Sequence, residues 1–286
     1  MIIIKSADEM RQWSFDQRSK GNKIGFVPTM GFLHEGHLSL IEIAQKEAEK
    51  VVLSIFVNPA QFSPDEDFES YPRDEKRDLR LCREKGVDVV FLPAVNEMYP
   101  DNYSTYVIVE GLGDYLCGAS RQDHFRGVTT VVTKLFNAVL PSVAVFGQKD
   151  AQQGRIIERM TADLQFGINI KIASIVREQD GLAMSSRNVR LLPEHRKQAP
   201  AIFHGLGDIL KQFNSGTRDS VQLKDTFSSR LQKDAPNAAL DYVDVVDWNN
   251  LEPVESISSK ALIAVAVYLG KVRLIDNIIL EQVSAE

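Results

Sequence analysis

Two histidines stand close together near the start of the chain, in the stretch FVPTMGFLHEGHLSLI at residues 26–41. A short apolar run ends before them, and an amphipathic helical pattern begins near His37. The first N–H groups of a helix lack partners and, together with the helix dipole, attract anions. His34 and His37 can donate hydrogen bonds to phosphate oxygens there, and Gly31 and Gly36 allow close backbone approach. We therefore predict a phosphate site at this turn.

The His-x-x-His spacing leaves two other interpretations open. It is also found in metal sites, and Glu35 lies between the two histidines, but no third ligand follows at a typical spacing. The sequence therefore assigns no metal ligands. Alternatively, the stretch is a glycine-containing turn with two surface histidines.

A second polar stretch, FGQKDAQQ at residues 146–153, follows a predicted strand and opens a predicted helix. Lys149 can neutralise a phosphate, and Asp150 and Gln153 can hold hydroxyls or a carboxylate. Ligands of parallel sheets bind at the carboxyl ends of strands, where this stretch would lie. The alternative is an ordinary helix start, with Asp150 as a favourable first-turn charge.

A third stretch, FVNPAQF at residues 56–62, also follows a predicted strand. The neutral amides of Asn58 and Gln61 suit the recognition of hydroxyls and carboxylates. An ordinary Asn-Pro turn is the alternative interpretation.

A fourth stretch, SSRN at residues 185–188, follows the last predicted strand of the first half. Its two hydroxyls and Arg187 could close over a polyphosphate, although such a sequence is also a common helix cap. Because all four motifs follow predicted strands or lie where two predicted domains join, chance is the poorer explanation of their arrangement.

Short apolar runs bounded by polar residues predict the strands that would position these motifs. They cover residues 24–27, 51–57, 87–92, 143–146 and 168–175. Helical patterns lie between them, at residues 37–50, 74–85 and 129–140. Alternating strands and helices favour an α/β fold, with a parallel sheet covered by helices on both faces.

The pattern changes after about residue 176. Helices are expected from residue 193 and over 219–233, followed by strands at 240–247, 261–270 and 272–280. Gly270 and Lys271 predict a tight hairpin between the last two strands. We therefore expect a small α+β domain in this part of the chain.

Composition excludes several classes of protein. The 286 residues are 44% hydrophobic and carry a net charge of -6, which disfavours a disordered chain and a nucleic-acid-binding protein. No apolar run is long enough for a membrane span, and the first residues lack the pattern of a signal peptide. Two cysteines, Cys82 and Cys117, make no disulfide framework and are expected to be packed thiols. These features predict a cytoplasmic protein with no membrane or nucleic-acid partner.

Taken together, the motifs resemble one family. The nucleotidyltransferase superfamily has a His-x-Gly-His signature, which MGFLHEGHLSL resembles, and a second Lys/Arg-bearing signature, which MSSRN resembles. With FVNPAQF, YPR and FGQKDAQQ in the same order, residues 26–188 resemble the pantoate–β-alanine ligase family.

The resemblance implies a Rossmann-like domain over residues 1–176, which would bind nucleotide and pantoate. It also implies a smaller α+β lid domain over residues 177–286. The chain would be a homodimer that uses ATP with Mg²⁺, takes pantoate and β-alanine as substrates, and makes a coenzyme A precursor.

The resemblance also assigns individual residues. Positions that match ATP contacts are Met30, Gly31, Phe32, Leu33, His34, Glu35, Gly36, His37, Gly147, Gln148, Lys149, Asp150, Val176, Met184, Ser185, Ser186 and Arg187. Gln61 matches a contact to both pantoate and β-alanine, and Gln153 a contact to pantoate. His37 matches a proton-donating residue and Val176 a backbone contact to adenine. Residues 121–127, RQDHFRG, resemble a segment near the substrate, to which we carry no role.

We hypothesise two half-reactions. The pantoate carboxylate attacks the α-phosphorus of ATP to give pantoyl adenylate and pyrophosphate, and the amine of β-alanine then gives pantothenate and AMP. His34, His37, Lys149 and Arg187 would be the catalytic groups, because they can stabilise developing charge. Asp65, Glu66 and Asp67 are expected to form a solvated loop. Two rival readings are a nucleotidyltransferase that stops after transfer to a phosphate-bearing acceptor, and a nucleotide sensor without catalysis.

Overall fold

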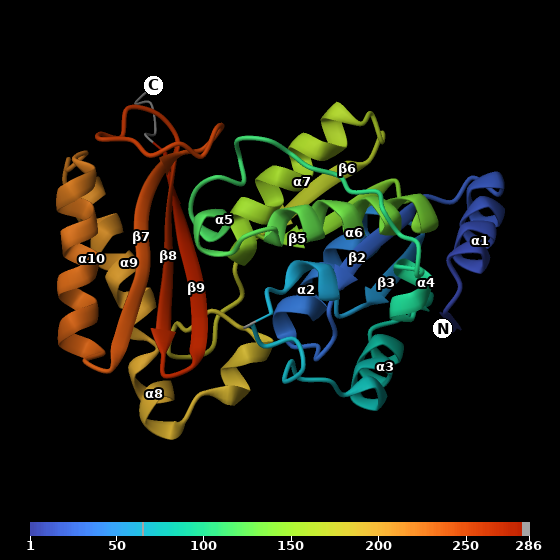
Figure 1. The fold of residues 1–286 in the computed structure, drawn as a ribbon, viewed down its shortest axis with the longest axis horizontal. Coiled ribbons are helices and arrows are strands. Elements are labelled where there is room, and N and C mark those ends of the chain that lie inside the picture. Colours follow the sequence, from blue (N-terminus) through green and yellow to red (C-terminus); the bar gives the residue numbers. More distant parts are fainter. Residues whose placement is uncertain (65, 282–286) are drawn as a thin grey trace. The chain divides into compact units, whose positions relative to one another are not determined.

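The computed structural model describes residues 1–64 and 66–281, and the chain divides into two compact units (Figure 1). Unit 1 comprises residues 1–110, 121–148 and 153–174. Unit 2 comprises residues 111–120, 149–152 and the chain from residue 175 onward. Two short segments of the first half therefore group with the C-terminal part. The assignment of separate functional domains to residues 1–176 and 177–286 stays a prediction.

Unit 1 is built on a parallel sheet. Its strands are β1 (Ile2–Ile4), β2 (Ile24–Thr29), β3 (Lys50–Ile55), β4 (Val89–Phe91), β5 (Val143–Gly147) and β6 (Asn169–Ala173), in the order β1-β4-β3-β2-β5-β6. All ladders between them are parallel, and Gly25 of β2 lies opposite Val51 on one side and Val143 on the other. The predicted parallel sheet is confirmed.

Helices cover both faces of this sheet. They are α1 (Ala7–Ser19), α2 (Glu35–Glu47), α3 (Glu75–Glu84), α4 (Val95–Met98), α6 (His124–Val139) and α7 (Ala151–Asp163), with 3-10 turns η1 (Pro59–Gln61) and η2 (Gln148–Asp150). Residues 149–152, at the end of η2 and the start of α7, group with unit 2. Val27 of β2 lies in one core cluster with Ile41 of α2, whereas the ring of the adjacent Phe26 lies 6.3 Å from that of Phe136 on α6. Because neighbouring strand residues point to opposite faces, α2 and α6 lie on opposite sides of the sheet.

Several element boundaries differ from the sequence expectation. The helix predicted at residues 37–50 spans Glu35–Glu47, and the helix expected from residue 193 is two helices, Pro193–Gln198 and Ala201–Asn214. Helix α6 begins at His124 rather than near residue 129, after Asp123 in a left-handed conformation (φ 60°). Strand β1 and helix α1 were not predicted. Strand β1 has only three residues, and α1 buries only Met10 and Ser14, so neither gives a clear periodic pattern.

Unit 2 contains a three-stranded antiparallel sheet and helices. Its elements are α5 (Cys117–Ser120), η3 (Ser186–Arg190), α8 (Pro193–Gln198), α9 (Ala201–Asn214), α10 (Ser220–Asp234), β7 (Ala238–Asp247), β8 (Ala261–Leu269) and β9 (Val272–Leu280). Leu269 pairs with Val272, which leaves Gly270 and Lys271 as a two-residue turn with Gly270 at φ 60°. The predicted hairpin and α+β character are confirmed.

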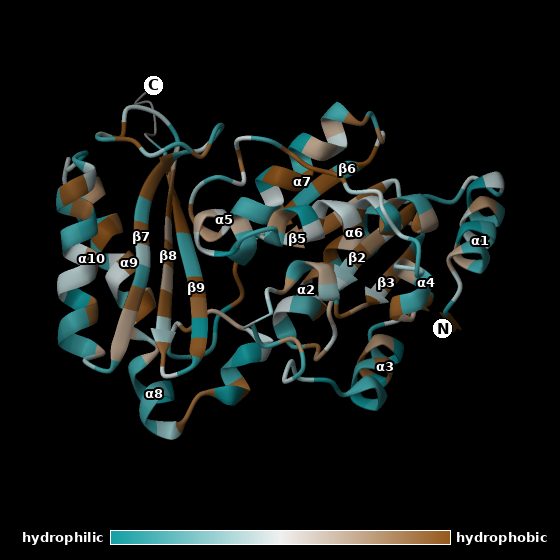
Figure 2. Cartoon of the chain, viewed as in Figure 1, coloured by the Kyte–Doolittle hydropathy of each residue, from teal (hydrophilic) through white to brown (hydrophobic). Residues whose placement is uncertain are grey.

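The core of unit 2 lies between its sheet and two helices. Leu206 of α9 and Phe227 of α10 share one buried cluster with Ile263 and Val265 of β8. In Figure 2 the central strand β8 is largely coloured as hydrophobic, whereas α8 is largely hydrophilic. Among the described residues, no helix is both long enough and apolar enough to cross a membrane.

Candidate functional site

The strand order of unit 1 reverses at β2 and β5. From β2 the chain adds β3 and β4 on one side, and it later adds β5 and β6 on the other. Open α/β sheets bind ligands outside the carboxyl ends of the strands at such a switch point. Residues 30–37 follow β2, and Gly147 and Gln148 are the last residue of β5 and the residue after it. The fold therefore brings the two ATP segments predicted in unit 1 to the same edge of the sheet.

The turn from β2 to α2 is fixed by a buried carboxylate. Gly31 and Phe32 have positive φ angles of 83° and 50°. The side chain of Asp78 on α3, only 1% exposed, accepts hydrogen bonds from the backbone N–H groups of Phe32 (2.7 Å) and Leu33 (2.8 Å). A Cβ at Gly31 would lie 2.9 Å from Ile55 Cγ2 and 3.0 Å from Asp78 Oδ2, so this position requires glycine.

Asp78 changes how the turn can meet an anion. Burial raises the pKa of the Asp78 carboxyl, while hydrogen bonds from Leu33 and Phe32 act to lower that pKa. Successive N–H groups of this kind often bind an external anion, but here they face the protein's own carboxylate. In the predicted phosphate site, the contacts would therefore come from the first turn of α2 and the two imidazoles.

His34 and His37 lie together at the start of α2. Their ring centroids are 4.0 Å apart, and the backbone N–H of His34 donates to Nδ1 of His37 (3.3 Å). Since Nδ1 of His37 accepts, the proton of the neutral ring is on Nε2, which can donate it to another oxygen. Two predicted catalytic residues are thus brought together, with His37 in the donor form.

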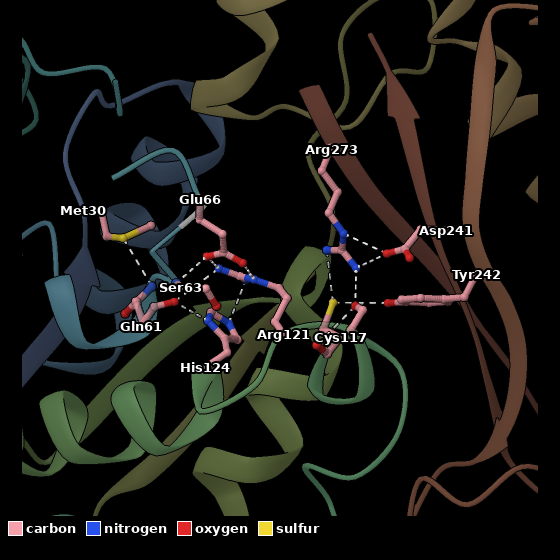
Figure 3. Close-up of polar contacts among 11 residues, drawn as sticks. Met30, Gln61, Ser63, Glu66, Cys117, Arg121, His124, Asp241, Tyr242 and Arg273 are labelled. Atoms are coloured by element: carbon pink, nitrogen blue, oxygen red, sulfur yellow. Dashed lines mark hydrogen bonds and ion pairs between the residues drawn. The ribbon is translucent and has the colours of Figure 1, made fainter. Parts of the chain in front are cut away.

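Gln61 is oriented by polar neighbours of unit 1. Asn58 donates from Nδ2 to Gln61 Oε1 (3.1 Å), and Gln61 Nε2 contacts Met30 Sδ (3.3 Å; Figure 3). The Tyr99 hydroxyl donates to Asn58 Oδ1 (2.8 Å), and burial raises the pKa of Tyr99, which keeps this donor protonated. The amide of Gln61 therefore lies beside the first residue of the predicted ATP segment.

In unit 2, the predicted nucleotide residues Val176 and Met184 meet across a tight turn. The backbone N–H of Met184 donates to the Val176 carbonyl (3.0 Å), and Gly181 reverses the chain with φ 91°. Ser185 then accepts a hydrogen bond from the Arg187 backbone N–H (3.2 Å) at the start of η3. The helix-cap interpretation of SSRN is therefore correct, and the cap holds Ser185, the buried Ser186 and Arg187 in one short turn.

Lys149 and Asp150 also belong to unit 2, whereas Gly147, Gln148 and Gln153 belong to unit 1. Asn277 of β9 donates to the Lys149 carbonyl (3.1 Å), and Lys149 Nζ lies 3.7 Å from Asp150 Oδ2. Gln153 is half-buried near the start of α7. Within the units, three pairs of predicted site residues are in contact: His34 with His37, Gln61 with Met30, and Val176 with Met184. That all these residues form a single site stays a prediction.

The acidic residues 65–67 differ from expectation. Asp65 lies outside the described residues, but Glu66 is half-buried and pairs with Arg121, so the solvated-loop prediction is wrong for Glu66. Sequence reasoning did not detect this pair, because its two residues lie in separate motifs. In residues 1–64 and 66–281, no group of three or more His, Cys, Asp or Glu side chains is arranged to hold a metal. The use of Mg²⁺ therefore stays a prediction, and no residue is assigned to a metal.

Both cysteines are packed, as expected. Burial raises the pKa of the Cys82 thiol to about 12. In unit 2, Cys117 Sγ lies 3.2 Å from the Tyr242 hydroxyl and 3.6 Å from Arg273 Nη1, and Arg273 pairs with Asp241 (2.7 Å; Figure 3).

Comparison with known proteins identifies the family. Residues 2–279 match the family Pantoate-beta-alanine ligase. The chain belongs to this family. Among curated relatives, the pantothenate synthetase of Thermosipho melanesiensis is 53% identical over 279 residues, covering 98% of this chain and 99% of the relative. That of Thermotoga neapolitana is 53% identical over 280 residues, covering 98% and 100%.

Solved structures of family members agree with this fold. Pantothenate synthetase from Thermus thermophilus has a TM-score of 0.91 at 42% identity, covering 97% of this chain and 99% of its own. Pantoate-beta-alanine ligase from Francisella tularensis, complexed with beta-gamma ATP and beta-alanine, has a TM-score of 0.78 at 33% identity, with 97% of each chain covered. The predicted family, fold class and activity are confirmed: the chain is an ATP-using ligase of pantoate and β-alanine.

Proposed function

We propose that the ligation proceeds through pantoyl adenylate. The pantoate carboxylate attacks the α-phosphorus of ATP, and the bond to the pyrophosphate group breaks. The neutral amine of β-alanine then attacks the activated carbonyl, AMP leaves, and the amine loses a proton as the amide forms. The carboxylate is ionised near neutral pH, so the first step needs no base.

The observation that carries this proposal is the arrangement at the switch point of unit 1. The paired rings of His34 and His37 follow β2, and Gln61, which follows β3, contacts Met30 of the same turn. The element proposed to bind phosphate and the amide proposed to bind a carboxylate thus lie at one edge of the sheet. This juxtaposition suits an attack by an acid on a nucleotide, because the barrier lies mainly in positioning two anions.

The residues of unit 1 would bind and orient the substrates. In the proposed site, His34 and His37 donate to phosphate oxygens at the start of α2, with Gly147 and Gln148 at the neighbouring strand end. Gln61 and Gln153 hold pantoate through neutral amides, and Gln61 also contacts β-alanine. Asn58 fixes the Gln61 amide, which reduces the reorientation needed when substrate arrives.

The residues of unit 2 would complete the nucleotide site. Lys149, Arg187 and the hydroxyls of Ser185 and Ser186 stabilise charge as pyrophosphate leaves, while Val176 contacts adenine. The C-terminal part then acts as a lid that keeps the hydrolysable adenylate away from water. When bound, Mg²⁺ would be held mainly by the phosphates of ATP and would offset part of their charge.

We also propose that the protein is a cytoplasmic homodimer that produces pantothenate for coenzyme A synthesis. Family membership supports this proposal. Sedimentation analysis of the purified protein would test the dimer directly.

Product analysis tests the proposed chemistry. ATP, pantoate and β-alanine are supplied together, and each is then omitted in turn. We expect exchange between labelled pyrophosphate and ATP that requires pantoate but not β-alanine, and free AMP in stoichiometric amount only when both acids are present. Pyrophosphate exchange that is independent of pantoate would contradict the adenylate pathway and favour another nucleotidyl transfer. No exchange and no turnover would indicate a nucleotide sensor.

A further inference from the structure

Arg121, which lies three residues before α6, and His124, the first residue of α6, contact the backbone of Gln61. We propose that they are positioning residues for Gln61, and that His124 acts as a neutral imidazole protonated on Nδ1. This inference rests on the proposed role of Gln61 as a substrate contact. It concerns RQDHFRG, the segment to which the sequence assigned no function.

The contacts converge on one carbonyl group (Figure 3). His124 Nδ1 lies 2.8 Å from the Gln61 carbonyl oxygen, and Arg121 Nη2 lies 3.3 Å from the same oxygen. Arg121 Nη1 lies 3.0 Å from the other ring nitrogen of His124, Nε2. The side chain of His124 is buried. A guanidinium and an imidazole thus hold the same backbone oxygen of Gln61.

These partners determine where the proton of His124 lies. A carbonyl oxygen only accepts and a guanidinium only donates. His124 Nδ1 must therefore carry the hydrogen, and Nε2 must accept from Arg121. An imidazolium would place a second N–H group against the Arg121 guanidinium, which would break this contact.

Glu66 fixes Arg121 in the orientation that this arrangement requires. Arg121 donates to both carboxylate oxygens of Glu66, at 2.6 Å from Nε and 2.8 Å from Nη2. Both side chains are largely buried, and a two-point pair of this kind restricts the guanidinium to one plane. Arg121 thereby bonds both the Glu66 carboxylate and the Gln61 carbonyl.

The same helix also controls the side chain of Gln61. The Gly127 carbonyl of α6 accepts a hydrogen bond from Asn58 Nδ2 (3.1 Å), the same group that donates to Gln61 Oε1. A Cβ at Gly127 would lie 2.1 Å from the Ala60 carbonyl oxygen, so α6 and η1 approach backbone to backbone. The start of α6 therefore sets the position of Gln61 through its main chain and the direction of its amide through Asn58.

The tautomer is tested on the intact wild-type protein, without any activity assay. The chain has five histidines, so a long-range ¹H–¹⁵N spectrum of histidine-labelled protein resolves few rings. The His124 signals are assigned by their loss in His124→Asn. We expect a neutral ring at neutral pH, with Nδ1 protonated and Nε2 unprotonated. A ring protonated on Nε2, or an imidazolium, would overturn the inference.

Two substitutions separate the two hydrogen bonds of His124. Asparagine places its amide near the position of Nδ1 and can still donate to the Gln61 carbonyl, whereas glutamine reaches the position of Nε2 and can still accept from Arg121. We expect His124→Gln to raise the KM for pantoate and for β-alanine by about three- to tenfold, the effect of one lost hydrogen bond, with the KM for ATP unchanged. His124→Asn should lie closer to wild type.

The matched control is His204→Asn, the same substitution at an exposed histidine of α9. It should leave all three KM values unchanged. Equal KM values in His124→Gln and wild type would contradict the inference. An equal rise of the KM values for ATP, pantoate and β-alanine would also contradict it. If His124→Gln does not fold, Arg121→Lys gives the same test, because lysine keeps the positive charge but lacks the planar guanidinium that bonds Glu66, His124 and Gln61 together. Absence of pantoate-dependent pyrophosphate exchange in wild type would instead contradict the proposed function.

Discussion

The buried carboxylate of Asp78 provides a sharp test of how the β2–α2 turn is built. It accepts two short hydrogen bonds, from the backbone N–H groups of Phe32 and Leu33, at the start of the predicted ATP segment. In Asp78→Asn the side chain has nearly the same shape, but only one oxygen remains to accept. The new amide group would face the second backbone N–H, donor against donor.

The expected cost follows from these two contacts. A hydrogen bond to a charged group contributes about 1.5–3 kcal/mol, and an unsatisfied buried N–H costs about 1–3 kcal/mol. Removing the buried charge offsets part of this loss, because burial already raises the pKa of Asp78 and so disfavours its ionised form. We therefore expect unit 1 to lose about 2 kcal/mol of unfolding free energy, and the affinity for ATP to fall about tenfold.

Tryptophan fluorescence during urea unfolding measures this loss in unit 1. The chain has two tryptophans, Trp13 on α1 in unit 1 and Trp248 in unit 2, so a Trp248→Phe background isolates the signal of unit 1. The matched control is Asp74→Asn, the same substitution one turn earlier, at the exposed N-cap of α3. Asparagine caps as well as aspartate, so the control should change stability by less than about 0.5 kcal/mol. If both variants matched wild type in stability and ATP affinity, our explanation of the turn would be refuted.

Four further predictions concern both units. His37→Ala should slow pantoate-dependent pyrophosphate exchange by about 10²–10³-fold with an unchanged circular dichroism spectrum, and near-normal exchange would remove it from the site. Lys149→Ala should lower kcat/KM for ATP by about tenfold or more in steady-state kinetics, and unchanged values would exclude its role. Burial acts to raise the pKa of Glu66, but Arg121 outweighs it, so the pKa of Glu66 is lowered in the folded state. The ion pair therefore stabilises the folded state at pH values above the unfolded pKa of Glu66. This stabilisation is lost as the pH falls through the folded pKa. The difference in urea stability between wild type and Glu66→Gln should therefore shrink from about pH 7 to about pH 3, and a constant difference would contradict the ion pair. Gly181→Ala should cost unit 2 about 1–3 kcal/mol by Trp248 fluorescence, because φ is 91° and the new Cβ would lie 2.1 Å from the Phe203 ring; a neutral effect would disprove this strain.

The sequence predicted the structure best where an apolar strand pattern is followed directly by polar side chains. Strands β2, β3 and β5 were predictable because each is mainly apolar and largely buried, as expected for a sheet covered on both faces. The contact between Gln61, which follows β3, and Met30, which follows β2, agrees with the expectation that motifs after parallel strands lie at one edge of the sheet. The pairing of His34 with His37 likewise follows from their spacing across the start of a helix.

The supporting contacts were not predictable, because they join residues far apart in sequence. Asp78 reads as one charge in the highly charged helix α3, and nothing nearby indicates that it reaches Phe32, 46 residues earlier. Arg121 and Glu66 are 55 residues apart, and Lys149 and Asn277 are 128 residues apart. Residues 149–152 group with unit 2, although the sequence assigned them to the first domain. Besides the contact of Lys149 with Asn277, the Gln152 amide bonds the backbone of Leu112, Tyr115 and Cys117 in unit 2.

Our central claim is that the turn between β2 and α2 holds the triphosphate during activation of an acid. The most direct measurement is a crystal structure of the protein with a non-hydrolysable ATP analogue, Mg²⁺ and pantoate. We predict phosphate oxygens within about 3 Å of the side chains of His34 and His37, with the pantoate carboxylate beside Gln61. A triphosphate bound at any other edge of the sheet, with both imidazoles facing only water, would contradict the claim.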